Sequence, residues 1–175
     1  FYEKGSKLEI DYDKNIISIY QNKVGAKTHI KDGSLQGTKI IFNGVGISKD
    51  TIPPNYPIDT KGLTGCLSLI NLNLKNVDIS FTNSNCEDSV NFINSNGNVK
   101  KISIKNSYSD ALDVDFSELV FDKVDVLNAK NDCIDFSYGN YNLGELVLSD
   151  CGDKAVSVGE GSKLDIKNLK AFNSN

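Results

Sequence analysis

Residues 109–117 read Ser109-Asp110-Ala111-Leu112-Asp113-Val114-Asp115-Phe116-Ser117, and variants of this stretch recur along the second half of the chain. The other copies begin at Glu87, Asn131 and Gly152. Their leading aspartates recur at a nearly constant step (Asp88, Asp110, Asp132 and Asp153). A fixed period in the twenties is typical of solenoids, in which each repeat stacks on its neighbours.

Each repeat also contains short segments in which apolar and polar residues alternate. One repeat contains Leu119-x-Phe121, Val124-x-Val126 and Ile134-x-Phe136. Segments of period two are short strands with one apolar face, and a coil gives parallel strands the long crossover that they need. We therefore predict an all-β fold, a right-handed parallel β-helix (a single-stranded solenoid) with about 22 residues and three short strands per coil.

A second column supports this register. Its members each follow the last apolar residue of a strand by two positions, and they recur at the same step as the aspartates (Asn83, Asn106, Asn128 and Asp150). We expect inward-pointing side chains at a coil corner, where the amides hydrogen-bond to their counterparts in the coils above and below.

The two parts of the chain differ in regularity. Residues 1–62 contain β-branched runs out of register, so we expect irregular first coils or an N-terminal cap, followed by a loop with Pro53, Pro54 and Pro57. Residues 63–175 should form the regular coils, and no helix is predicted. Because the sequence stops just before its next acidic strand, we expect flanking domains of a larger chain, or a partner on this edge.

Composition excludes some classes of function. The formal charge is −4, and all 19 basic residues are lysines. A chain without arginine and with an acidic surface is a poor nucleic-acid binder. No apolar run approaches the roughly 18 residues of a membrane span.

Stacking should place the acidic residues in two columns. The first holds the leading aspartates; the second, three positions on, holds Asn91, Asp113 and Asp135. Neighbouring coils lie about 4.8 Å apart, so four carboxylates would gather, with Asp115 close by (Asp110, Asp113, Asp132 and Asp135).

Three interpretations of these carboxylates remain open. The leading aspartates can accept backbone N–H groups at a coil corner, as aspartate does in turns. Alternatively, Asp110, Asp113, Asp132 and Asp135 can bind a hard cation such as Ca²⁺. Two carboxylates with different pKa values can also serve as an acid/base pair for sugar chemistry.

Tyrosines lie next to the acidic strand. Tyr138 and Tyr141 fall in a predicted loop, Ser137 to Asn142, and exposed rings beside carboxylates suit a polysaccharide groove, although ordinary loop tyrosines fit the sequence as well. The predicted ligand-binding residues are Asp113, Asp115, Asp135, Tyr138 and Tyr141. His29, the single histidine, is expected on the surface or in the cap.

The cysteines follow the coils. Two columns each hold a like pair three coils apart, which is too far for a disulfide (Cys66 with Cys133, Cys86 with Cys151). The unlike pairs, Cys66 with Cys86 and Cys133 with Cys151, are one coil apart and could form disulfides. Four buried free thiols are the other possibility, and without a C-x-x-C pattern zinc is not expected.

The repeats from Gly65 to Asn175 resemble the right-handed parallel β-helix superfamily that includes pectate lyases. The segment Gly152 to Glu160 is similar to β-helical regions of bacterial surface proteins, some of which carry CotH-like domains. The resemblance implies an extracellular location and polysaccharide as a frequent substrate. The chain has no Arg and none of the superfamily's catalytic patterns, so no catalytic residue is assigned.

We therefore expect a non-catalytic β-helical domain of a larger bacterial secreted or surface protein, which binds glycan or mediates assembly through a protein partner. One alternative is a carbohydrate-active enzyme (a lyase, hydrolase or epimerase) that uses the acidic columns. Another is a structural rod that self-associates through its coil ends.

Overall fold

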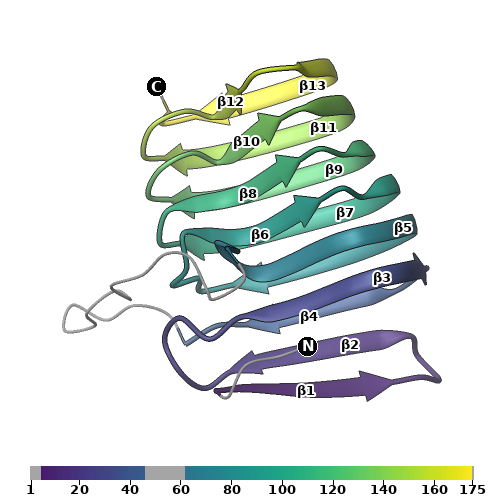
Figure 1. The fold of residues 1–175 in the computed structure, drawn as a ribbon. Helices are drawn as coiled ribbons and strands as arrows, with labels where there is room; N and C mark the ends of the chain where they lie inside the picture. Colours follow the sequence, from purple (N-terminus) through teal and green to yellow (C-terminus); the bar gives the residue numbers. More distant parts are fainter. Residues whose placement is uncertain (1–4, 46–61, 175) are drawn as a thin grey trace.

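A computed structural model describes residues 5–45 and 62–174 of the chain. The strands stack as the coils of a parallel solenoid, which is right-handed when followed from the N-terminal end to the C-terminal end (Figure 1). One core column shows the stacking, because its members lie in register in successive coils (Leu67, Val90, Leu112, Ile134 and Val156). The predicted parallel β-helix is confirmed.

Each regular coil contains one short and one long strand. The short strands carry the acidic repeat and form one side of the solenoid: β6 (Asp88–Ile93), β8 (Asp110–Asp115), β10 (Ile134–Ser137) and β12 (Val156–Val158). The long strands form the remaining sides: β7 (Asn96–Ser107), β9 (Glu118–Ala129), β11 (Gly139–Cys151) and β13 (Ser162–Phe172). Strand β5 (Gly65–Thr82) serves both sides, because its first part pairs with β6 and the rest with β7.

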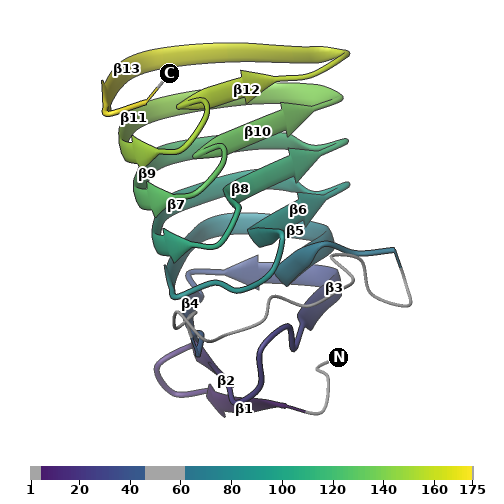
Figure 2. The ribbon, with the colours of Figure 1, turned by 90° about the vertical axis from the view of Figure 1, so that its left-hand side faces the viewer.

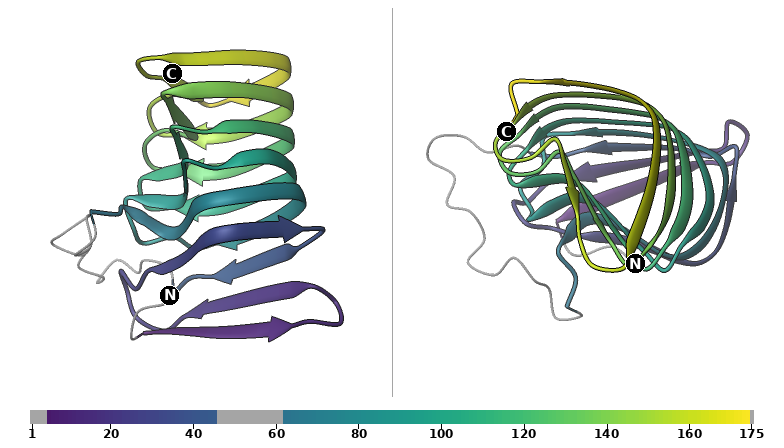
Figure 3. Two further views of the ribbon diagram at one scale, coloured as in Figure 1. Left: turned by 45° about the vertical axis from the view of Figure 1, so that its right-hand side comes forward. Right: turned by 90° about the horizontal axis from the view of Figure 1, so that it is seen from above.

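The prediction of three strands in each coil is wrong, because each regular coil contains two strands in the structure. The second and third run on as a single strand that bends, so that Leu119 and Val126 both belong to β9. The curvature is evident in the view along the axis (Figure 3). At the bend of β11 the coils approach so closely that a Cβ on Gly144 would lie 2.3 Å from the carbonyl oxygen of Asp122.

The first coils differ from the later ones. Strands β3 (Thr28–Gln36) and β4 (Lys39–Asn43) pair in parallel with β5 and belong to the stack. Strand β2 (Ile16–Gln21) pairs in parallel with β4 and antiparallel with β1 (Ser6–Asp11). The end of the solenoid therefore carries an antiparallel hairpin. Pro53, Pro54 and Pro57 lie outside the described residues.

Apolar side chains fill the interior in columns. Leu69, Phe92, Val114 and Phe136 are each 0% exposed, as are most members of the parallel columns. The last coil breaks this pattern, because Val158 and Leu169 continue inward columns yet are 55% and 47% exposed. The described part of the chain contains no helix, and none of its elements is a helix long and apolar enough to cross a membrane.

The asparagine column forms a hydrogen-bonded ladder. Asn106 Nδ2 donates to Asn83 Oδ1 at 3.0 Å, and Asn128 Nδ2 donates to Asn106 Oδ1 at 3.1 Å. The expectation that these side chains point inward is wrong, since Asn106 and Asn128 are exposed. Their φ angles of 61° and 64° are left-handed, a conformation that Asn tolerates, and it turns the corner with the amide in solvent.

All four cysteines form disulfides, so the alternative of four free thiols is wrong and the two unlike pairs considered possible are the ones that form. Cys66 pairs with Cys86, and Cys133 pairs with Cys151. In each pair, one cysteine begins the acidic side and the other lies where the same coil returns to it, with Cα atoms 5.4 and 5.3 Å apart. Each disulfide therefore joins the two ends of one turn of the solenoid.

Candidate functional site

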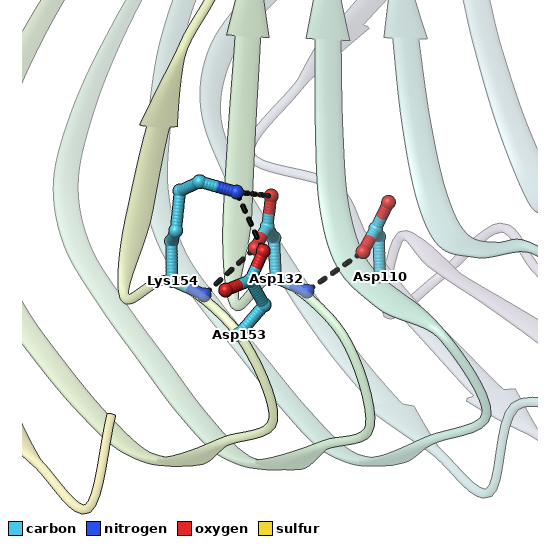
Figure 4. A network of polar contacts seen from close by, with 4 residues as sticks. All are labelled: Asp110, Asp132, Asp153 and Lys154. Atoms are coloured by element: carbon cyan, nitrogen blue, oxygen red, sulfur yellow. Dashed lines mark hydrogen bonds and ion pairs between the residues drawn. The ribbon is translucent and has the colours of Figure 1, made fainter. Parts of the chain in front are cut away.

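The leading aspartates hold one coil to the next. Asp110 Oδ1 accepts the backbone N–H of Asp132 at 2.8 Å, and Asp132 Oδ1 accepts the backbone N–H of Lys154 at 2.8 Å (Figure 4). Lys154 Nζ also lies 3.7 Å from Asp132 and 2.6 Å from Asp153. The interpretation of Asp110 and Asp132 as acceptors of backbone N–H groups is confirmed. Each carboxylate links its own coil to the next one.

Residues of the second column alternate with core residues such as Leu112 and Val114, so they lie on the outer side of the short strands, which form the face toward the viewer in Figure 2. Asn91, Asp113 and Asp135 lie in register on β6, β8 and β10. The column continues through Ser68 to His29 on β3, so the histidine belongs to the same outer face. His29 is only 2% exposed, and the prediction of a surface or cap position is wrong.

Asp113 and Asp115 form a coupled carboxyl pair on this face. Asn91 Nδ2 donates to Asp113 Oδ2 at 2.7 Å and to Asp115 Oδ2 at 3.3 Å. Burial, followed by repulsion from Asp88, Asp115 and Asp135, raises the pKa of Asp113 to about 9. Its retained proton is donated to Asp115, whose own pKa is raised by burial and lowered in part by these hydrogen bonds.

Two further titratable groups border the pair. Burial raises the pKa of Asp88 to about 7, against a hydrogen bond to Thr64 that lowers it. Burial also raises the pKa of Asp110, opposed by the N–H of Asp132. The acidic face thus carries less negative charge at neutral pH than its number of aspartates suggests.

Two polar side chains of this column have atoms without a hydrogen-bond partner within residues 5–45 and 62–174. Asn91 uses its amide nitrogen on the two carboxyl groups, and its Oδ1 has no hydrogen-bond partner among the described residues. Ser68 Oγ, next to it in register, also has none in this part of the chain. Asn91 and Ser68 are 1% and 0% exposed, and unpartnered polar atoms at such depth are costly.

The described residues contain no group of three or more His, Cys, Asp or Glu side chains placed to hold a metal ion. The four carboxylates considered for Ca²⁺ do not converge, because Asp110 and Asp132 turn to backbone N–H groups while Asp113 and Asp135 face outward.

The two predicted tyrosines differ in position. The prediction that Tyr141 is exposed is wrong, because it lies in β11 in register with Leu119 and is 1% exposed. Its hydroxyl has one hydrogen to donate and lies within hydrogen-bond distance of two carbonyl oxygens, those of Val114 and Ser137. Tyr138 is 48% exposed and occupies the corner between β10 and β11 with a φ of 48°.

Tyr138 stacks on Phe116, a residue that the sequence prediction missed. The ring centroids lie 5.0 Å apart with an interplanar angle of 4°, and Phe116 is 58% exposed. Both residues follow the last inward residue of their strand by two positions, one period of the repeat apart, so the repeat itself contained the signal. The pair forms an exposed apolar ridge along one corner.

A groove begins directly beyond this ridge. It has a volume of about 430 Å³ on the outer face of β7, β9 and β11, and its polar lining consists of Asn98, Glu118, Asn140 and Asn142. Asn98 Nδ2 donates to Asp122 Oδ1 at 3.0 Å, while Asn98 Oδ1 is buried and has no partner within the described structure. Val120, 39% exposed, adds an apolar contact.

The ridge therefore separates two polar surfaces. Glu118 follows Phe116 by two positions and opens the groove, while Asp115 precedes it and belongs to the acidic face. We define the corner site as the ridge (Phe116 and Tyr138) with the flanking Asp115, Glu118 and Asn140.

Comparisons with known protein families, with curated proteins and with solved structures found no match to this chain. The assignment of the parallel β-helix architecture therefore rests on the structure alone, and no related protein suggests an activity for this chain.

Proposed function

We propose that this chain is a non-catalytic β-helical domain of a secreted or surface protein and that it binds glycan at the corner site. The observation that carries the proposal is the amide-lined groove, whose lining residues Glu118 and Asn140 each follow a member of the exposed Phe116–Tyr138 pair by two positions. Sugars combine apolar C–H surface with hydroxyl groups, so they suit a site where aromatic and aliphatic contacts adjoin amides and a carboxylate.

The disulfides support the extracellular part of the proposal. Disulfides persist in oxidising compartments and are rare in the reducing cytosol. Here the structure pairs all four cysteines, and each pair closes one coil of the solenoid.

The test is glycan-array screening followed by calorimetric titration with the best oligosaccharide. We expect the Phe116→Ala/Tyr138→Ala double variant to weaken binding by about tenfold or more, since stacked apolar contacts of this kind contribute about 1–3 kcal/mol in total. Tyr12→Ala is the matched control, because Tyr12 is 84% exposed at the opposite end of the molecule. A chain that binds no glycan, or a double variant that binds as tightly as the wild type, would contradict the proposal.

A carbohydrate-active enzyme is the second candidate, and the Asp113–Asp115 pair favours it. Asp113 keeps its proton at neutral pH while Asp115 accepts a hydrogen bond from it, which is the division that acid/base chemistry uses. If the domain turns over a polysaccharide, Asp113→Asn should abolish the turnover and Asp135→Asn should reduce it. Turnover that persists in both variants would eliminate this candidate.

A further inference from the structure

We propose that the glycan taken by the corner site is a basic one, a polymer of amino sugars with free protonated amines, rather than a polyuronate or a sulfated chain. This inference rests on the proposed function and specifies the class of ligand.

The distribution of charge around the ridge is the first step. Asp115 and Asp135 lie on the acidic side of the ridge, and Glu118 lies on the groove side. Glu160 adjoins the ridge from the next coil, where its backbone carbonyl accepts the N–H of Tyr138 at 3.0 Å. Four acidic residues therefore lie in the segments that flank two exposed rings.

None of these carboxylates makes an ion pair in the described part of the chain. The pKa of Lys154 is raised by its hydrogen bond to Asp153 and by the charge of Asp132, and the negative charge of Asp135 is also near enough to contribute. The lysines that make ion pairs elsewhere on the coils do so with other acids: Lys101 and Lys123 with Asp125, Lys123 with Glu145, and Lys154 with Asp132 and Asp153. None of the described ion pairs involves Asp115, Asp135, Glu118 or Glu160. On the groove face, Lys163 and Asp165 lie one coil above Asn140 and Asn142, and their charges offset each other.

The hydrogen-bonding capacity of the site is equally one-sided. On the acidic side of the ridge, Asn91 already uses its amide nitrogen on Asp113 and Asp115, so this donor is not free for a ligand. In the groove, Asn140 Nδ2 reaches Glu118 Oε1 only at 3.5 Å, and Asn98 Oδ1 is a buried acceptor without a partner in the described structure.

A ligand that brings donors and positive charge would satisfy both features. An ammonium group has three donors and no acceptor, and a carboxylate is its natural partner. A uronate or sulfate would bring negative charge and further acceptors to a surface that already has an excess of both. A sugar polymer should therefore bind more tightly when its rings carry free amines than when they carry carboxylate or sulfate groups.

The experiment compares three oligosaccharides of equal length by calorimetric titration: the glucosamine hexamer, the N-acetylglucosamine hexamer and the galacturonate hexamer. At low salt, we expect the glucosamine hexamer to bind about tenfold tighter than its acetylated counterpart and the galacturonate hexamer to bind weakest, since one charge pair in water contributes roughly fivefold. High salt should shrink the preference for glucosamine.

Isosteric variants identify the carboxylates responsible. Glu118→Gln and Asp115→Asn should each reduce the affinity for the glucosamine hexamer roughly fivefold and leave that for the acetylated hexamer nearly unchanged. Glu145→Gln is the matched control, because it changes the net charge equally at a carboxylate that already pairs with Lys123.

The outcomes separate the two proposals. Should no hexamer and no arrayed glycan bind, both proposals fail. If binding depends on Phe116 and Tyr138 but the galacturonate hexamer binds as tightly as the glucosamine hexamer, only this inference is overturned. Equal losses in the Glu118→Gln and Glu145→Gln variants would likewise overturn it, because a general charge effect would then explain the preference.

Discussion

Burial and the neighbouring carboxylates raise the pKa of Asp113 to about 9, further than that of Asp88. A carboxyl group with a raised pKa binds its proton more tightly in the folded chain than in the unfolded chain. Between about pH 4, where an unperturbed aspartate titrates, and about pH 9, Asp113 is protonated in the folded chain and ionised in the unfolded chain. Asp88, whose pKa is raised to about 7, acts in the same direction over a narrower range.

The free energy of unfolding should therefore fall as the pH rises from about 4 to about 9. Asp113→Asn retains the shape of the side chain and removes the ionisation, so we expect this variant to be the more stable one at alkaline pH by at least about 1.4 kcal/mol, the equivalent of one pKa unit. Its remaining decline should end near pH 7, where Asp88 finishes titrating.

Urea unfolding at a series of pH values would measure this effect. Asp165→Asn is the matched control, because its carboxylate is exposed on β13. An Asp113→Asn variant with the same pH profile as the wild type would show that Asp113 is ionised in the folded protein.

Substitutions at Asn128 test how much the left-handed corner conformation contributes to stability. Its left-handed φ of 64° and its hydrogen bond to Asn106 make two separate demands on the side chain. Asn128→Ala meets neither and should cost about 1–2 kcal/mol of unfolding free energy, whereas Asn128→Gly meets the backbone demand and should cost less. Equal losses in chemical denaturation would show that the ladder, and not the backbone, decides the stability of this corner.

At the scale of the elements, the disulfides join the start of an acidic strand to the end of the same coil. Cys133 and Cys151 are 18 residues apart, and a closed loop of this size restricts the unfolded chain by about 3 kcal/mol. We expect the Cys133→Ser/Cys151→Ser variant to lose about that much unfolding free energy in guanidinium titrations without reductant. Thiol titration of the denatured wild type should find no free thiol, and four reactive thiols would contradict the pairing.

The strands that could be predicted from the sequence are those that belong to the regular repeat. The constant period predicts the short strands, the stacking and the asparagine column, because identical spacing places residues in one column. Adding that period to Leu119 gives Tyr141, and adding it to Phe116 gives Tyr138, so register predicts both the burial of Tyr141 and the aromatic pair. Assigning the two tyrosines to a loop on their composition alone overlooked this register.

Other features could not follow from the repeat. His29 joins the acidic face through β3, and the long separation in sequence between Thr28 and its partner Leu67 conceals the register. The bend that merges two predicted strands leaves the alternation of side chains intact on each arm, so the pattern cannot distinguish one bent strand from two. The coil spacing indicated which cysteines could pair, Cys66 with Cys86 and Cys133 with Cys151, but it could not decide between disulfides and free thiols.

At the scale of the whole molecule, the solenoid is stabilised where coils have neighbours on both sides. Leu146 and Leu169 occupy the same inward column in consecutive coils, yet they are 0% and 47% exposed. Leu146→Ala should cost about 2–5 kcal/mol of unfolding free energy, and Leu169→Ala about 1 kcal/mol or less. Similar losses in denaturant titrations would show that the last coil is covered in solution.

The corner site also belongs to the whole molecule, because it exists only where coils stack. Phe116 and Tyr138 come from successive coils, and the groove needs three strands side by side. No single repeat contains the ridge, the carboxylates and the amide lining together. The function we propose is therefore a property of the stack and should disappear with the fold.

The most direct test is nuclear magnetic resonance mapping of amide shifts during titration with the oligosaccharide that binds most tightly in the array and hexamer experiments. We predict that perturbations concentrate at the corner site, at residues 115–118 and 138–142, and leave the hairpin β1–β2 unchanged. Perturbations confined to other surfaces, or none at saturating ligand, would contradict glycan binding at this corner.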